Sequence, residues 1–342
     1  TVYGIYDQSA TSEKYMVYYN SVYLGGSVTG ASNSRAYNWS IASTSKVRNN
    51  IFVNARSGGS GKHYAIAYNT TYANITSDYN CIYNAGGTGN VFGYDGTIDR
   101  ATIAAFRTAT GKETNSVNGN PQFASTTTLV PVSSGTGVVY GMNMGNGSTT
   151  ATSVDFNGAS RSSTNPDMGA YEFTASIDLT GLGNTTLPAG TYSGLTWTGN
   201  TCTFSGDVTI DGTLNLTNGI IDMGANTLTI GTSAGNTGNL TRSGGSIKGI
   251  VKRWFGTSTT TNSVFPLDYG DGANYVGASI SFTSAPSTGG TLTAQYFTSG
   301  AGNFASNGGA GFINVGGLWP GVNFINVASQ YWRITAGDGL AG

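Results

Sequence analysis

The sequence has little charge and few of the side chains that commonly carry out acid–base chemistry. Only 9% of its 342 residues are charged, and the formal net charge is −1, whereas an average soluble domain has about 25% charged residues. His63 is the sole histidine. Because this composition cannot form a strongly basic face, we expect no nucleic-acid partner.

Cysteine and long hydrophobic runs are also scarce. The two cysteines, Cys81 and Cys202, lie far apart, and neither belongs to a C-x-x-C pattern. We predict two buried free thiols rather than a bridge, and no zinc site. No apolar run approaches the roughly 18 residues of a membrane span. The sequence starts without Met, inside a strand-like pattern, so we interpret it as an excerpt of a longer, processed protein.

Small and polar residues dominate instead. Gly, Asn, Ser and Thr make up about half of the chain, and all four oppose helix interiors and favour turns or strands. At 38% hydrophobic and 11% aromatic residues, the chain is too apolar for a disordered protein. The composition therefore predicts an all-β fold.

The first ninety residues contain a repeated pattern without a helix between the copies. Residues 20–23, 49–52 and 80–83 read Asn-Ser-Val-Tyr, Asn-Asn-Ile-Phe and Asn-Cys-Ile-Tyr, with their leading asparagines 29 and 31 residues apart. Repeats of this length indicate stacked structural units. Without helices they predict the coils of a parallel β-helix, with equivalent residues about 4.8 Å apart.

This alignment predicts three columns of stacked side chains. One is an interior column, one is an amide ladder at a bend, and one is a column of outward aromatic rings. They comprise, in that order, Val22, Ile51 and Ile82; Asn20, Asn49 and Asn80; Tyr23, Phe52 and Tyr83. The aromatic column is either a strip on which sugars stack or part of a packed ladder.

The pattern changes further along the chain. Helical spacing predicts one short helix near residues 97–110, capped by Thr97 or Asp99 and stopped by Gly111. We predict a domain boundary near residue 175. Residues 176–342 then form a second β-rich domain, with short strands of a possible solenoid at 180–252 and longer strands of a β-sandwich at 253–342.

Three ordered motifs in the first domain carry a family resemblance. They occupy residues 118–123 (Asn-Gly-Asn-Pro-Gln-Phe), 155–161 (Asp-Phe-Asn-Gly-Ala-Ser-Arg) and 166–173 (Pro-Asp-Met-Gly-Ala-Tyr-Glu-Phe). Residues 1–173 resemble right-handed parallel β-helix proteins secreted by Bacteroidota, in which the last motif closes the solenoid. Residues 212–219 and 226–231 resemble Gly/Thr-rich modules of large adhesin-like surface proteins exported by the type IX secretion system. The resemblance implies an extracellular or outer-cell-surface location, and no single activity.

Parallel β-helices also host polysaccharide lyases and glycosidases, so a catalytic role is a candidate. A glycosidase needs paired carboxylates, and the repeat columns offer none. We predict no catalytic residue and no cofactor in this sequence. Arg161 with Asp167 and Glu172 favours a structural ion pair or capped turn, and His63 a turn or rim position. Asp268 and Asp271, in a Gly-rich loop, indicate either an ordinary turn or a weak Ca²⁺ site.

The sequence therefore favours a non-catalytic structural or adhesive module of a large extracellular or cell-surface bacterial protein. Its expected partners are surface glycans or another extracellular protein. Two alternatives remain: a carbohydrate-active β-helix enzyme with its catalytic coils upstream, and a carbohydrate-binding module that uses the aromatic strip.

Overall fold

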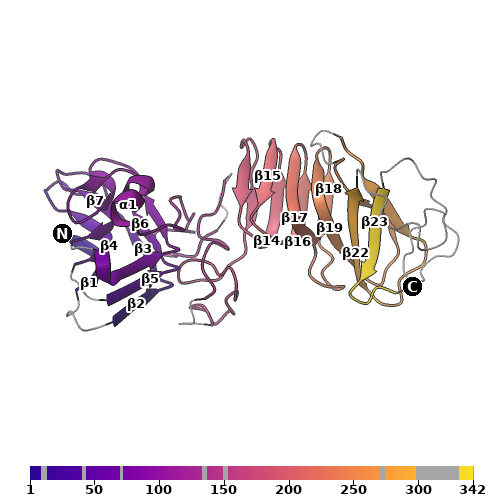
Figure 1. Cartoon of the computed structure of the whole chain (residues 1–342), viewed down its shortest axis with the longest axis horizontal. Helices are drawn as coiled ribbons and strands as arrows, with labels where there is room; N and C mark the ends of the chain where they lie inside the picture. The colour runs from indigo at the N-terminus through magenta and orange to yellow at the C-terminus, as the bar shows by residue number, and fades with distance from the viewer. Residues whose placement is uncertain are drawn as a thin grey trace. The chain divides into compact units, whose positions relative to one another are not determined.

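The computed structural model describes residues 1–8, 14–40, 44–69, 72–132, 137–148, 153–269, 274–297 and 331–341. The chain forms two compact units, one comprising Thr1–Ser134 with Val139–Phe173 and the other Gly135–Val138 with Thr174–Gly342. The division after Phe173 lies beside the boundary that we predict near residue 175. Strands are the main regular elements among the described residues of both units (Figure 1), which confirms the all-β class.

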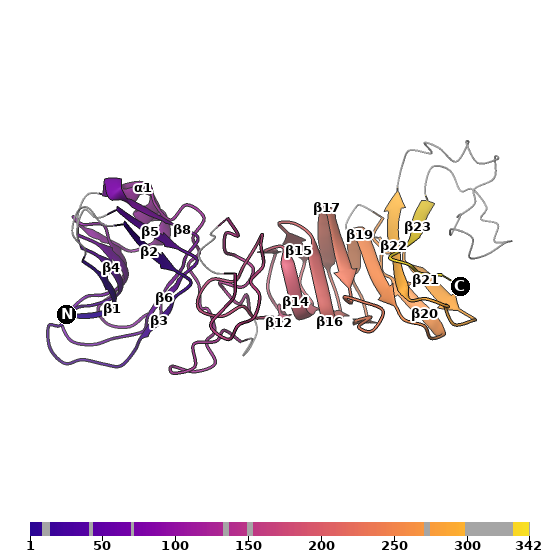
Figure 2. The ribbon, with the colours of Figure 1, turned by 90° about the horizontal axis from the view of Figure 1, so that it is seen from below.

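The first unit contains three sheets of parallel strands. They have the orders β1-β4-β7-β10, with β11 added antiparallel to β10, then β2-β5-β8 and β3-β6-β9. Figure 2 shows strands of these sheets lying side by side. The bounds are β1 Val2–Asp7, β2 Lys14–Tyr18, β3 Ser21–Leu24, β4 Ser34–Trp39, β5 Thr44–Arg48, β6 Ile51–Asn54, β7 His63–Tyr68, β8 Ile75–Asp78, β9 Cys81–Asn84, β10 Asn90–Tyr94 and β11 Asp99–Arg100, with a 3-10 helix at Tyr72–Asn74.

Each repeat of this unit contributes one strand to each sheet. We define the first repeat as β1–β3, the second as β4–β6 and the third as β7–β9. Pairing in the third sheet joins Ser21 to Ile51 and Ile51 to Cys81, so the period there is 30 residues in both steps. The core lies between the sheets, where the Tyr37 ring stacks on Phe52 with centroids 5.1 Å apart.

One α-helix, α1 (Ile103–Thr110), follows β11. The Thr102 hydroxyl caps it by accepting from the Ala105 N–H, and Gly111 ends it in the left-handed conformation with φ 65°. The predicted stop at Gly111 is therefore confirmed. The predicted start at residue 97 is wrong, because the Asp95 carboxylate accepts the N–H groups of Thr97 and Ile98 in a turn. Asp99, the other predicted cap, lies in β11.

The part of the first unit that follows α1, from residue 111 to residue 173, is called the covering segment here. Its described residues pack on the outer face of the β3-β6-β9 sheet. A second hydrophobic cluster joins Ile51, Val53 and Cys81 of that sheet to Met168, with the partly buried Phe123 and further residues around it. The Gly169 N–H donates to the Asn49 carbonyl. The last motif of the first unit therefore packs directly on the repeats.

The second unit is built around a ten-stranded sheet assembly. Parallel pairs join β12-β14-β16-β17-β19, as well as β13-β15-β17 and β16-β18, and neighbouring strands of this series lie side by side in Figure 1. The bounds are β12 Ser176–Asp178, β13 Thr185–Leu187, β14 Gly190–Trp197, β15 Thr201–Phe204, β16 Val208–Leu216, β17 Ile220–Ile230, β18 Asn239–Arg242, β19 Ser246–Phe255, β20 Thr260–Phe265, β21 Ala278–Phe282, β22 Gly290–Phe297 and β23 Tyr331–Gly337.

The direction of pairing changes after β19. β22 pairs antiparallel with β19, and β23 pairs antiparallel with β22, whereas β20 and β21 form a separate two-stranded sheet. The division that we predict at residue 253 falls inside β19, because Ile250 to Arg253 continue the parallel register against β17. Strands β22 and β23 therefore extend the sheet of the preceding strands and do not begin a new one.

Candidate functional site

The main polar feature of the first unit is a column of buried amides at a bend, formed by Asn20, Asn50 and Asn80, which we call the amide ladder. The Asn50 Oδ1 accepts from the backbone N of Asn20 at 2.9 Å and from its Nδ2 at 3.0 Å. The Asn80 Oδ1 accepts from the same two atoms of Asn50 at 3.0 and 2.9 Å. Asn50 and Asn80 are fully buried. The ladder satisfies backbone N–H groups that the bend removes from the sheets.

The structure places Asn50, not Asn49, in this ladder. Asn49 occupies the preceding position, where the backbone turns through the left-handed region with φ 57°, as it does at Tyr19 and Tyr79. Asparagine tolerates that conformation better than most residues. The Asn49 side chain instead binds Asn146 of the covering segment. Its Nδ2 donates to the Asn146 carbonyl at 3.0 Å, and its Oδ1 accepts from the Asn146 N–H at 2.9 Å.

In the structure, the second repeat aligns with the first and third one residue later than predicted. This also changes the other two predicted columns. Phe52 stacks with Val22 and Ile82, whereas Ile51 pairs with Ser21 and Cys81. Ile51 therefore leaves the predicted interior column and lies in the second hydrophobic cluster, beneath the covering segment.

The predicted aromatic strip is not a continuous surface. Phe52 is fully buried in the core, and Val53 stands between Tyr23 and Tyr83 in their column. Tyr23 and Tyr83 are partly buried and pack in the cluster under the covering segment, where the Tyr23 ring meets Phe123 edge-on at 6.5 Å. These rings serve packing in the structure, and Phe52 has no face open to a sugar.

Glu113 closes one end of the amide ladder. Its Oε2 accepts from the Asn80 Nδ2 at 3.1 Å and from the Ser116 hydroxyl, and its Oε1 accepts from the Tyr68 hydroxyl at 3.0 Å and from the Ser77 hydroxyl. The carboxyl group is fully buried, and this burial raises its pKa despite the four donors. Four donors around one buried carboxylate hold it in place without a paired cation among them.

His63 is buried in β7, and not at a turn or rim as predicted. Its Nε2 lies 3.0 Å from the Gly58 carbonyl, so this nitrogen carries the proton, and its Nδ1 then accepts from the Ser34 hydroxyl at 2.9 Å. The Ser34 hydroxyl in turn accepts from the Asn54 Nδ2 at 3.0 Å. This serine–histidine pair resembles a nucleophile and base, but both residues are fully buried. The backbone carbonyl of Gly58 occupies the position on the imidazole where a triad has a carboxylate.

Acidic residues of the covering segment accept hydrogen bonds from backbone N–H groups and so cap its turns. Asp167 accepts from the N–H groups of Asn143 and Phe173 at 2.6 and 2.5 Å. Glu172 accepts from the N–H groups of Ser162 and Asp167 at 2.9 and 3.0 Å, and it forms an ion pair with Arg161 at 3.4 Å. The structure thus contains both alternatives that the sequence favoured here, a structural ion pair and a set of capped turns.

These groups also show how the segment is fixed electrostatically. Burial and the nearby Glu172 raise the pKa of Asp167 well above its ordinary value. Burial alone would raise the pKa of Asp155 as well, but the N–H groups of Glu172, Ala159 and Asn157 lower it. The Arg161 guanidinium lies 4.0 Å from the centroid of the Tyr19 ring, so it ties the closing motif to the first bend of the repeats.

The predicted Ca²⁺ loop is only partly described. Asp271 lies outside the described residues, and Asp268 is buried, with its Oδ2 accepting from the Ser246 hydroxyl at 2.7 Å. Across the described ranges, no three His, Cys, Asp or Glu side chains come together in a way that could hold a metal ion. No helix in those ranges has the length and apolar character needed to cross a membrane.

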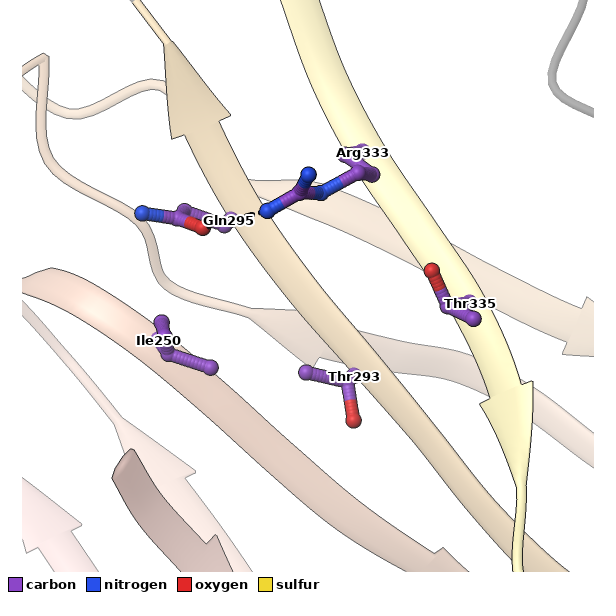
Figure 3. Close-up of a pocket in the computed structure, with 5 residues that line it drawn as sticks. All are labelled: Ile250, Thr293, Gln295, Arg333 and Thr335. Atoms are coloured by element: carbon purple, nitrogen blue, oxygen red, sulfur yellow. Dashed lines mark hydrogen bonds between the residues drawn. The ribbon is translucent and has the colours of Figure 1, made fainter. Parts of the chain in front are cut away.

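A hollow of about 340 Å³ lies against β19, β22 and β23 in the second unit. Figure 3 shows Arg333 and Gln295 pointing toward each other, joined by a hydrogen bond of 3.1 Å between Nη2 and Oε1. The rest of the lining is formed by Ile250, Thr293 and Thr335. The Arg333 guanidinium also lies 4.7 Å from the centroid of the Phe297 ring. The lining contains no carboxylate, so it lacks the parts for acid–base cleavage of a glycan.

The two cysteines are buried and unbridged, as predicted. Burial raises the pKa of each thiol to about 12. Neither is a thiolate near neutral pH, so neither is suited to nucleophilic or redox chemistry.

Comparison of the chain with protein-family models, with curated proteins and with solved structures found no match.

Sequence reasoning missed Asn50, Glu113 and the Ser34–His63 contact. The signal for Asn50 was present: aligning on residues 20, 50 and 80 gives two equal steps of 30, where the chosen alignment gives 29 and 31. No comparable signal marked Glu113, which lies outside the repeats and reaches them only through the fold.

Proposed function

We propose that the repeats of the first unit form a right-handed parallel β-helix, and that the chain is a non-catalytic structural, adhesin-like module of an extracellular or cell-surface protein. In the second unit, we propose that β12–β19 form a short β-solenoid that antiparallel strands complete. The β-helix proposal is supported by parallel pairing in all three sheets at a near-constant interval and by the amide ladder.

The main support for a structural role is that the polar side chains suited to catalysis bind other groups of the chain itself. Asp167 and Glu172 bind backbone N–H groups, Glu113 is enclosed by four donors, and His63 is enclosed between Ser34 and Gly58. Each of these side chains therefore stabilises the fold through hydrogen bonds within the chain. A stack whose polar groups bind its own backbone stays rigid without disulfides, which suits a spacer or stalk.

Single-molecule stretching tests the structural role. A repeat of 30 residues should release about 100 Å of contour length, at about 3.4 Å per residue. We expect force peaks separated by whole multiples of that length for the first unit. The Asn50→Ala variant, which interrupts the ladder, should lower the force of these peaks and leave those of the second unit unchanged. Smooth extension of the wild-type chain without peaks would contradict a mechanical role.

A glycan-cleavage assay tests the enzymatic alternative. Arg48 and Asp78 are register neighbours in β5 and β8, so they bring a basic and an acidic residue to adjacent positions on the repeats. We expect the chain, incubated with pectin, alginate and neutral glycans in the presence of calcium, to release neither unsaturated nor reducing ends. Turnover that disappears in Asp78→Asn or Arg48→Ala would instead establish an enzyme.

Location and adhesion need separate tests. An antibody against the chain should label intact cells of the source organism as strongly as lysed ones, and labelling only after lysis would contradict a surface location. The labelled chain should bind particular members of a glycan array or a purified surface protein. Binding that persists after heat denaturation would show that the folded module is not the adhesive element.

A further inference from the structure

The hollow against β19, β22 and β23 is lined by neighbouring side chains of one sheet face. Gln295 pairs with Arg333 across β22 and β23, and Thr293 pairs with Thr335. Residues two apart on a strand project to the same face, so these two cross-strand pairs lie next to each other, with Ile250 of β19 beside them. Figure 3 shows the five side chains and the strands that carry them. The strand register therefore places a guanidinium, an amide, two hydroxyls and an aliphatic side chain around one hollow.

The Arg333 guanidinium is oriented by two contacts that use only part of its donor capacity. Its Nη2 donates to the Gln295 Oε1 at 3.1 Å, and it lies 4.7 Å from the centroid of the Phe297 ring. A guanidinium has five N–H groups, and the other four donate to no residue in the described part of the chain. Because Arg333 is exposed, these N–H groups are donors for a ligand.

The positive charge of Arg333 also has no carboxylate partner among the described residues. Asp338, which follows β23 directly, pairs with the Lys252 Nζ at 2.7 Å and accepts from the Thr291 hydroxyl at 2.7 Å. Residues 298–330, between β22 and β23, contain no acidic residue in the sequence. The hollow thus carries one positive charge that an external carboxylate would neutralise.

These groups together match a sugar that carries one carboxylate. A guanidinium binds a carboxylate through two parallel N–H···O bonds. Hydroxyl and amide side chains both donate and accept, as the hydroxyl groups of a sugar require, and Ile250 offers apolar surface to the C–H groups of a sugar ring. The volume of about 340 Å³ lies at the lower end of the range of about 300–1,000 Å³ for small-molecule sites, which suits one sugar residue of a longer chain.

We propose that this hollow binds a uronic acid residue of an acidic polysaccharide, with Arg333 binding its carboxylate and Thr293 and Thr335 binding its hydroxyl groups. This inference deepens the proposed adhesive role by naming a ligand class, and it does not depend on the β-helix architecture of the first unit. An acidic peptide is the competing ligand. Protein-binding patches have an apolar core enriched in aromatic residues, whereas the described lining of this hollow has one apolar side chain, Ile250.

Calorimetric titration of the full chain tests the site. The probes are oligogalacturonate, oligomannuronate and oligoglucuronate, each compared with the same oligosaccharide after reduction of its carboxyl groups, and oligoglutamate represents the acidic peptide. Arg333→Gln removes the charge, and Arg333→Lys keeps the charge without the planar fork. The matched control is Arg242→Gln, which removes a positive charge of the same unit from a side chain that stacks on Tyr275 at 3.7 Å and does not line the hollow. The thermal midpoint of each variant reports its folding.

We expect at least one uronate probe to bind the wild type about tenfold or more tightly than its carboxyl-reduced form, because charge-assisted hydrogen bonds are the strong ones. Arg333→Gln should lower that affinity at least about tenfold, Arg333→Lys at least about threefold, and Arg242→Gln less than about twofold. Added salt should weaken the binding. In the wild type, the Nε–H resonance of Arg333 should shift when the probe is added, which tests the contact without a substitution.

Four results would overturn the proposal. They are no binding of any uronate probe, equal binding of the carboxyl-reduced forms, tighter binding of oligoglutamate, and an Arg333 resonance that does not shift while a uronate binds. Glycan-array binding that Arg333→Gln leaves unchanged would also overturn this site, but it would leave the adhesive role intact. Conversely, uronate binding that requires Arg333 would support the site even if antibody labelling of cells contradicted a surface location.

Discussion

Replacing Asn50 by alanine is the most direct test of the amide ladder. The side chain of Asn50 lies within hydrogen-bonding distance of five polar atoms, and the two hydrogens of its Nδ2 are shared among three acceptors. Its Oδ1 accepts two hydrogen bonds from Asn20, and its Nδ2 donates to the carbonyls of Val17 and Arg48 at 2.8 and 3.0 Å and to the Asn80 Oδ1 at 2.9 Å. The residue is fully buried, so water does not replace these partners easily.

The magnitude follows from what the substitution leaves behind. The Asn20 N–H and the Val17 carbonyl lose a partner, and an unsatisfied buried group costs about 1–3 kcal/mol. The Arg48 carbonyl keeps the Tyr19 N–H as a donor. The Asn80 Oδ1 keeps the backbone N–H of residue 50, so it contributes less. Allowing for some relaxation, we expect a loss of about 3–5 kcal/mol in the free energy of unfolding of the first unit, which is large for one substitution.

The matched control is Asn49→Gly, one residue away. It removes the two hydrogen bonds to Asn146, while glycine accepts the left-handed backbone that residue 49 requires. A loss of about 1–2 kcal/mol is expected there. Both losses are measured by denaturant titration, with hydrogen exchange of β4–β9 to localise them. If Asn50→Ala costs less than Asn49→Gly, or less than about 1 kcal/mol, the ladder does not stabilise the repeats as argued.

Two further predictions concern buried ionisable groups. Because burial raises the pKa of Glu113, the folded state holds its proton to a higher pH than the unfolded state, so this group reduces stability as pH rises above about 4.3. Glu113→Gln should remove that part of the pH dependence, and parallel wild-type and variant stability curves between pH 4 and 8 would refute it. With pKa values of about 12, the thiols of Cys81 and Cys202 should resist an aromatic disulfide reagent at pH 8 until the chain is unfolded, and rapid labelling of either native thiol would contradict their burial.

The sequence predicted the strand-rich class and the existence of a repeat, because both depend on local patterns. The exact alignment failed at Asn49 and Asn50, where two adjacent asparagines perform different tasks. One supplies a backbone conformation and the other a side-chain ladder. Residue type alone does not separate these tasks, although the equal steps of 30 residues would have done so.

The parts that could not be predicted depend on contacts between distant segments. Phe52 was expected to face outward by strict alternation, yet it lies in the core beside Tyr37. The outer face of β3, β6 and β9 was a candidate binding strip only because no local pattern indicated that Phe123 and Met168 pack against it. A surface that looks free in a repeat alignment can thus be an internal interface.

The shortage of charge and the large number of buried polar contacts have a common physical explanation. Closely stacked repeats bring equivalent side chains within about 5 Å of one another, and a column of like charges at that spacing would repel. Neutral amides can instead alternate donor and acceptor along the column, as Asn20, Asn50 and Asn80 do. A single carboxylate suffices at the end, where Glu113 meets only donors. The composition that makes this chain poor in catalytic groups is therefore the one that lets its repeats stack.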